Sequence, residues 1–91
     1  MAAILHLNLR REFFAQIAPG TKRIEYRRRT PYWRHRLERR HYDVIQFRNG
    51  YATQAPEMHV EFLGVRQIRK RSKPVYAIRL GRVVKIKRWR P

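Results

Sequence analysis

Three side chains able to do acid–base or phosphate chemistry stand close together in residues 20–27 (GTKRIEYR): Lys22, Glu25 and Arg27. A lysine can bind phosphate or, when desolvated, act as a base. A carboxylate beside cations is held ionised and can serve as a general base. An arginine can clamp a phosphate or hold the carboxylate in place. Taken alone, these residue types favour a structural Glu25–Arg27 ion pair, and the alternative takes Lys22, Glu25 and Arg27 as candidate catalytic residues.

These three side chains meet only under one geometric condition. Side chains alternate between the two faces of a strand, so in a regular strand Lys22 points away from Glu25 and Arg27. They converge if Lys22 lies in the turn before the strand, or if a bulge redirects it.

A second candidate region, residues 27–41 (RRRTPYWRHRLERRH), mixes arginines with aromatic rings. Arginine pairs with phosphates, and aromatic faces stack on unpaired bases. Trp33 is expected in the core with Leu37, and Tyr32 fits either role. Near the Asn49-Gly50 turn, the side chains of Arg48, Asn49 and Tyr51 can line the mouth of a cleft. The candidate nucleic-acid-binding residues are Tyr26, Arg28, Arg29, Tyr32, Arg34, Arg36, Arg48, Asn49 and Tyr51.

The charge balance points to a polyanionic partner. The 91 residues contain 23 Lys and Arg against six Asp and Glu, a net charge of +17, and 18 of the cations are Arg. Such an excess repels itself unless a polyanion neutralises it, and nucleic acid gains affinity by releasing counterions. The competing interpretation is that the excess positive charge serves only to keep the protein soluble. The cationic runs 66–73 and 85–91 are expected as mobile edges that strengthen binding or deter edge-to-edge aggregation.

Several classes of protein are disfavoured. There is no Cys, which excludes disulfides and thiol catalysis. The four His are scattered without metal-ligand spacing, so we expect no metal and no cofactor. No segment has the composition of a secretory signal or a membrane span, so we expect a cytoplasmic protein without membrane contact.

The hydrophobic pattern predicts an α+β, mainly β domain over residues 1–91, ending in a basic strand and tail at 81–91. Alternation predicts five to six strands, and Pro19-Gly20 ends the first of two short helices. Gly81 is expected to kink or divide the last strand, and residues 66–74 form a loop or ribbon tip. The strands are expected at 3–9, 21–29, 42–48, 58–65 and 75–89, and the helices at 10–18 and 31–40.

The candidate segment resembles the ASCH domain family of the PUA-like superfamily. That family carries a GxKxxExR motif at a helix-to-strand junction, matched here by Gly20, Lys22, Glu25 and Arg27. The segments EFFAQI and DVIQFRNGY also resemble the family pattern, and the resemblance spans about residues 4–86. It implies a small β-barrel whose motif residues point into a cleft between barrel and helices, and it favours a functional site at Lys22, Glu25 and Arg27 over a purely structural ion pair.

The resemblance also implies a role with RNA. ASCH domains are associated with RNA binding, coactivator regulation, ribonuclease activity and deacetylation of N4-acetylcytidine. The amidohydrolase members use a Thr nucleophile where this chain has Glu25, which disfavours that activity. We therefore expect an RNA-binding protein with a cationic cleft, acting in RNA processing or regulation. The alternatives are a small ribonuclease using Lys22, Glu25 and Arg27, and a protein-interaction subunit of a larger RNA machine.

Overall fold

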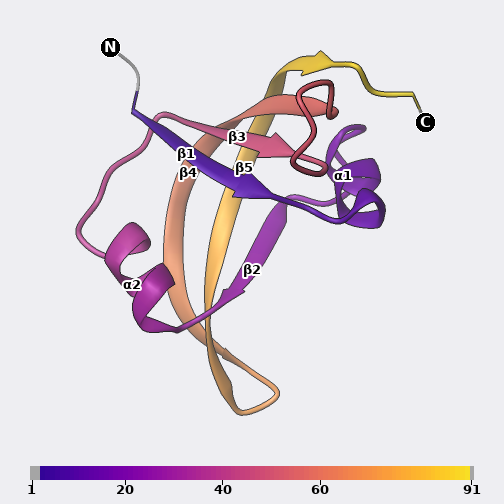
Figure 1. The fold of residues 1–91 in the computed structure, drawn as a ribbon. Helices are drawn as coiled ribbons and strands as arrows, with labels where there is room; N and C mark the ends of the chain where they lie inside the picture. Colours follow the sequence, from indigo (N-terminus) through magenta and orange to yellow (C-terminus); the bar gives the residue numbers. More distant parts are fainter. Residues whose placement is uncertain (1–2, 91) are drawn as a thin grey trace.

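A computed structural model describes residues 3–90 of the chain (Figure 1). It confirms a mainly β fold with two short helices. The elements in chain order are β1 (Ile4–Asn8), α1 (Arg11–Ile17), β2 (Ile24–Arg28), α2 (Pro31–Leu37), β3 (Val44–Arg48), β4 (Glu57–Lys70) and β5 (Lys73–Lys87).

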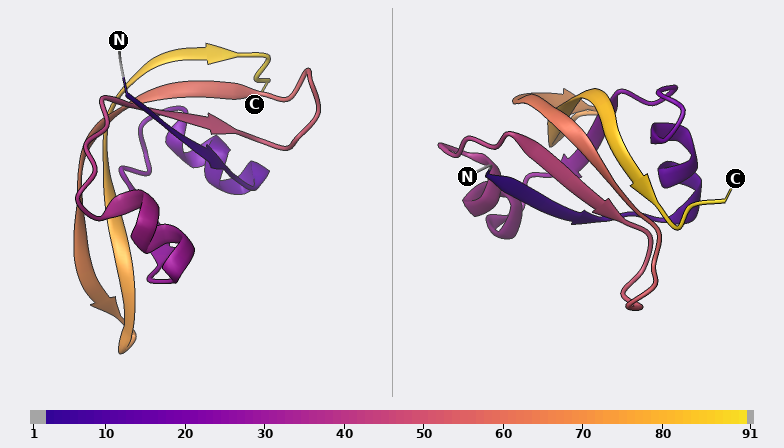
Figure 2. Two further views of the ribbon diagram at one scale, coloured as in Figure 1. Left: turned by 60° about the vertical axis from the view of Figure 1, so that its left-hand side comes forward. Right: turned by 90° about the horizontal axis from the view of Figure 1, so that it is seen from above.

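The five strands form one sheet in the order β1-β3-β4-β5-β2. β1 pairs with β3 in parallel, and the other neighbours are antiparallel. The sheet curls into a half-barrel, with β4 and β5 as a long arched ribbon (Figure 2). Since β1 and β2 are the two edges and do not pair, the barrel stays open between them.

Register shifts in the β4–β5 ribbon explain the curl. Val60 pairs with Val83 but Phe62 pairs with Leu80, so the register shifts between the two pairs. The shift means that β5 has one more residue than β4 between the two pairs. Such an extra residue is a β-bulge, which bends the strand and increases its twist. Gly81 lies at this shift, and β5 continues through it as one long strand, the first of the two predicted alternatives.

The core lies on the concave side of the half-barrel, beneath the arch where both helices sit (Figure 2). α1 buries Phe14 and Ile17, and α2 buries Leu37. The alternating leucines of β1 meet them there, as the sequence pattern predicts. The largest fully buried side chains are Tyr76, Phe14, Phe47, Ile17, Leu37, Ile45, Met58, Ile78 and Val60.

The second helix begins as predicted and ends earlier. The Trp33 backbone N–H donates to Thr30 Oγ1 at 3.3 Å, and Pro31 occupies the first turn. The prediction that the helix reaches residue 40 is wrong, because Glu38 is extended (φ −88°, ψ 134°) and Arg39 is left-handed (φ 59°). The Tyr76 hydroxyl donates to Glu38 of this extended segment and ties it to β5.

The cationic segments 66–73 and 85–91, expected as mobile edges, are both held in place by the fold up to residue 90. Residues 66–70 and 73–74 are strand, and only Arg71 and Ser72 form the turn, so the ribbon-tip alternative is correct. In the C-terminal segment, the Trp89 ring packs on Phe14 at 4.8 Å, and the Arg11 guanidinium lies 4.6 Å from the Trp89 ring centre. The tail is therefore anchored on α1 through Trp89. Pro91, at its end, lies outside the described residues.

Within residues 3–90, neither helix has the length and apolar character that crossing a membrane requires.

Candidate nucleic-acid interface

The backbone brings Lys22, Glu25 and Arg27 together. Gly20 adopts φ +87°, a conformation that favours glycine, and the Lys22 backbone N–H donates to the Gln16 carbonyl at 2.9 Å. Lys22 therefore lies in the turn, because β2 begins only at Ile24. This is the geometric condition that convergence requires.

Glu25 is the centre of this charged group. Its Oε1 lies 3.6 Å from Lys22 Nζ, and its Oε2 accepts a 2.9 Å hydrogen bond from Arg27 Nε. The Glu25 side chain is only 7% exposed. A buried carboxylate needs such partners, because burying an unpaired charge is costly. The structural ion pair is thus present, and it holds Arg27 in a fixed orientation.

Arg27 connects this group to the open side of the half-barrel. Its Nη2 donates to the Asn8 carbonyl of β1 at 3.0 Å, and its guanidinium lies 5.0 Å from the Trp33 ring centre. One side chain on β2 therefore contacts β1 and α2. This planar cation is positioned by three groups, one each from β2, β1 and α2.

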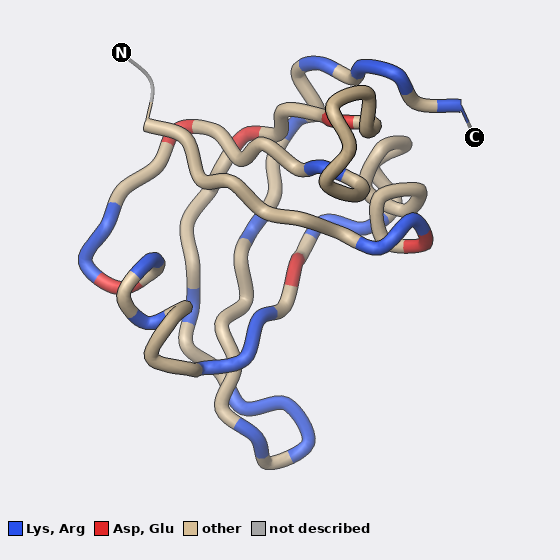
Figure 3. The backbone as a smooth tube through the Cα atoms, in the orientation of Figure 1, with Lys and Arg blue, Asp and Glu red and all other residues tan. Residues whose placement is uncertain are grey.

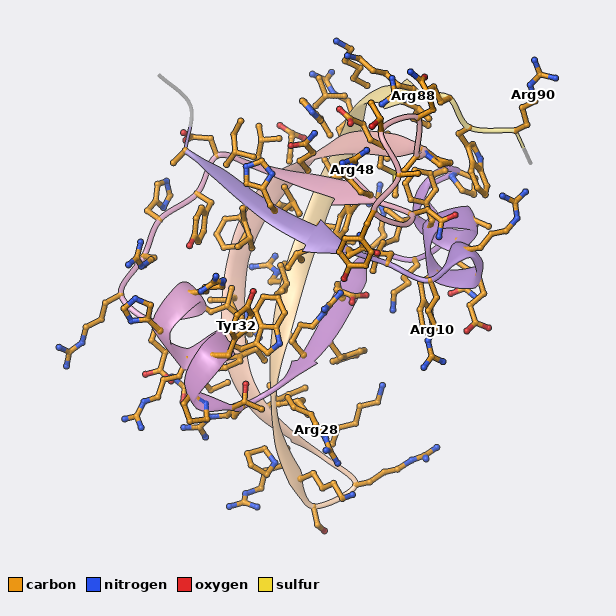
Figure 4. The ribbon with its side chains drawn as sticks, viewed as in Figure 1. Arg10, Arg28, Tyr32, Arg48, Arg88 and Arg90 are labelled. Atoms are coloured by element: carbon orange, nitrogen blue, oxygen red, sulfur yellow. The ribbon has the colours of Figure 1, made fainter. Side chains whose placement is uncertain are left out.

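Arg27 lines a cleft of about 380 Å³, which we call the aromatic cleft. Arg48 supplies a second cation, and Tyr32 (55% exposed) and Tyr51 (89% exposed) supply free ring surface. Tyr32 and Arg48 enter it from α2 and β3 (Figure 4). The lining residues are His6, Leu7, Asn8, Arg27, Tyr32, Trp33, Gln46, Arg48, Gly50 and Tyr51.

A neighbouring hollow of about 460 Å³ shares His6 and Tyr32 with the aromatic cleft. Arg36 and Arg40 line it from the α2 side. The Arg36 guanidinium stacks on Tyr32, 3.9 Å from the ring centre. Arg36 thus stiffens the exposed ring and adds positive charge beside it.

Other predicted binding residues lie outside the aromatic cleft. Arg34 pairs with Glu38 (3.9 Å) on the exposed side of α2. Asn49 is structural, since its Nδ2 donates to the Leu9 carbonyl at 2.9 Å. Arg28 and Arg29 lie at the end of β2 next to β5, beside Val75 and Pro74.

Tyr26 takes part in a different contact. The Lys70 ammonium lies 3.6 Å from its ring centre, and the Lys22 ammonium lies 5.6 Å from it. Alternation along β2 places Tyr26 on the face opposite to Glu25 and Arg27. Tyr26 therefore belongs to the outer, cationic face of the sheet.

Sequence reasoning missed three polar residues of the cleft, His6, Asn8 and Gln46. A signal was present, because His6 and Asn8 are the polar positions of an alternating strand. The missing information was the partner strand: β1 pairs with β3 so that His6 lies beside Gln46, and Asn8 beside Arg48. Trp33, expected in the core, is half-buried and contributes to both the core and the cleft.

Arg48 is held by Glu57, a half-buried carboxylate. Arg48 and Arg88 lie 3.7 and 3.3 Å from Glu57 Oε1, and Gln46 Nε2 donates to Oε2 at 2.8 Å. Burial by itself raises the pKa of the Glu57 carboxyl. The hydrogen bond from Gln46 and the charges of Arg88, Lys87 and Arg48 outweigh burial, so this pKa lies below its usual value.

Positive charge is distributed unevenly around the fold. Lys and Arg gather on α2, at the end of β2, at the tip of the β4–β5 ribbon and along the C-terminal segment, as Figure 3 shows. In the part of the chain from residue 3 to residue 90, no cluster of three His, Asp or Glu is arranged to hold a metal ion.

The fold and this site define a small, basic half-barrel protein with a cleft built from arginine and aromatic side chains. The chain matches no protein-family model, no curated protein and no solved structure. The relationship to the ASCH family therefore stays a prediction, based on the motif residues and the two flanking segments.

Proposed function

We propose that this protein binds RNA and places an unpaired nucleotide in the aromatic cleft. One observation carries the proposal: Arg27 and Arg48 flank the same 380 Å³ space as Tyr32, Trp33 and Tyr51. Aromatic rings and guanidinium planes stack on unpaired bases, and guanidinium groups pair with phosphates. The cleft thus offers both contacts that a nucleotide needs.

The size and lining of the cleft agree with this ligand. Its volume falls within the range of about 300–1,000 Å³ that is usual for small-ligand sites. His6, Asn8 and Gln46 supply hydrogen-bonding groups that can meet a base edge. Glu25 and the Asn8 carbonyl already hold Arg27 in place. Nucleotide binding therefore costs little further ordering of the Arg27 side chain.

The charge of the whole chain supports a polymer rather than a free nucleotide. A net charge of +17 on 91 residues raises the local concentration of a polyanion and gives affinity through counterion release. The motif resemblance to ASCH domains agrees with this function and with a role in RNA processing or regulation.

Titrating pure protein with a labelled single-stranded RNA over a salt series tests the proposal. We expect log K to fall linearly with log salt, by about 0.7 for each phosphate contacted. An RNA of the same length with abasic positions is the matched ligand, and it should bind more weakly. Absence of binding at low salt would overturn the proposal, and equal affinity for the abasic RNA would remove the nucleotide from the cleft.

Ribonuclease activity is the second candidate, favoured by the contact of Glu25 with both Lys22 and Arg27. In this role Lys22 and Glu25 supply acid–base groups and Arg27 stabilises phosphate charge. Incubation of the protein with labelled single-stranded RNA tests it. Cleavage should disappear in Glu25→Gln and Lys22→Ala, and cleavage that survives both changes would refute this use of the two residues.

A further inference from the structure

The β4–β5 ribbon extends beyond the body of the half-barrel as a hairpin, residues 66–73, here called the cationic hairpin (Figure 1). It contains five cations and no acidic residue: Arg66, Arg69, Lys70, Arg71 and Lys73. All five are exposed. Among the ion pairs of residues 3–90, none involves a residue of this hairpin.

The turn of the cationic hairpin is built against local preference. Arg71 (φ 52°) and Ser72 (φ 65°) are both left-handed, and Lys70 pairs directly with Lys73 across them. A two-residue turn with two positive φ angles favours Asn-Gly. Like charges that face each other across a ribbon repel. Costs of this kind cluster where a segment has a function beyond folding.

The register places cations on both faces of the hairpin. Alternation puts Arg66, Lys70 and Lys73 on the outer face, together with Arg28 of the adjacent β2. Arg69 is on the opposite face, the one that carries Tyr76 and Arg27 further along the sheet. The hairpin segment has no aromatic side chain to stack on a base. Its chemistry is therefore that of phosphate contact from two sides.

We propose that the cationic hairpin binds the sugar–phosphate backbones of a base-paired RNA stem next to the unpaired nucleotide. A single strand offers its phosphates along one line, whereas the groove of a stem is bordered by phosphates on both sides. Cations on the two faces of a projecting ribbon match that second arrangement. A pre-formed ribbon also suits a rigid array of phosphates, since neither partner must be ordered on binding.

This inference deepens the proposed function and rests on it. The substrate class becomes a structured RNA in which an unpaired nucleotide adjoins a stem. The cleft selects the unpaired nucleotide by stacking, while the hairpin adds affinity that is independent of sequence.

Two RNAs test the inference: a single strand, and the same strand extended by a base-paired stem. The variant is Arg69→Gln with Arg71→Gln and Lys73→Gln. The matched control removes three exposed cations elsewhere, by Arg82→Gln, Lys85→Gln and Arg90→Gln. We expect wild type and the control to prefer the stem RNA. The hairpin variant should lose that preference, and its salt slope on the stem RNA should fall by about 2–3.

A second variant separates binding from folding. Arg71→Asn with Ser72→Gly suits the turn better, so it should raise the midpoint of urea unfolding while weakening stem binding. Failure of wild type to bind either RNA overturns the proposed function itself. Equal losses on both RNAs, or an equal loss in the matched control, overturn the hairpin's role and leave the cleft proposal standing. In contrast, Tyr32→Ala should weaken the binding of both RNAs by the same factor.

Discussion

Arg27 and Asn8 are joined across the open side of the half-barrel, where Arg27 Nη2 donates to the Asn8 carbonyl at 3.0 Å. The two residues lie on β2 and β1, the unpaired edges of the sheet. Because the same guanidinium also donates to Glu25, it links the charged group of the motif to the wall of the aromatic cleft. Arg27 is therefore held in place at the wall of the cleft from both edges of the sheet.

Arg27→Lys should destabilise the fold by about 1–3 kcal/mol, measured by urea unfolding. A lysine ammonium lacks the planar fork that reaches Glu25 and Asn8 together. Arg28→Lys, the neighbouring exposed position, is the matched control and should change stability by less than about 0.5 kcal/mol. Equal stability of the two variants would contradict the link.

Glu25→Gln should lower the free energy of unfolding by about 1–3 kcal/mol. It removes the charge that compensates two cations with side-chain exposures of 19% and 21%. The loss is smaller than for a fully buried pair, because solvent still screens both cations. Glu12→Gln removes the same charge from an exposed pair with Arg10 at 4.0 Å, and it should have little effect. The comparison fails if Glu12→Gln costs as much.

Tyr32→Ala should weaken RNA binding by about 5- to 150-fold, corresponding to one stacked base. The ring is 55% exposed, so the thermal stability should change little. Fluorescence anisotropy with a single-stranded RNA measures the affinity. Tyr32→Phe keeps the ring and should bind like wild type. Wild-type affinity in Tyr32→Ala would remove this ring from the interface.

Glu57 should make stability depend on acid pH. Its pKa lies below its usual value of 4.5 in the folded protein, so its contribution is present above about pH 4.5. That contribution is lost as pH falls through the lower folded pKa, because protonation removes the pairing with Arg48 and Arg88. Unfolding measured from neutral pH down to acid should show a shallower decline in Glu57→Gln. An identical decline in the variant and wild type would argue against this assignment.

Gly81→Ala should destabilise the ribbon by about 1–3 kcal/mol through overpacking. A Cβ at this position would lie 2.8 Å from Glu61 Cβ on the facing strand. Glu61→Gly removes that atom, so the added cost of Gly81→Ala should shrink in this background. A cost that is independent of the residue at position 61 would mean that the close approach does not limit the site.

Local patterns in the sequence were enough for the elements of this fold. Alternation along residues 3–9 marks β1, and Thr30-Pro31 marks the start of α2. The extended Glu38 and left-handed Arg39 ended α2 early, a deviation that nothing in the helical pattern of residues 31–40 signals. The predicted end of the fourth strand at residue 65 is also wrong, because β4 continues to Lys70. Cross-strand pairing there outweighs a composition that is typical of loops.

The candidate site divides in the same way. The residue types, their spacing and the motif resemblance named Lys22, Glu25 and Arg27, and the charge excess indicated an anionic partner. Only the tertiary structure decided that Arg27 meets Asn8 and Trp33, and that His6 and Gln46 border the same space. The physical reason is that the order β1-β3-β4-β5-β2 brings distant segments together through non-local pairing and bulges, which alternation along one strand does not encode.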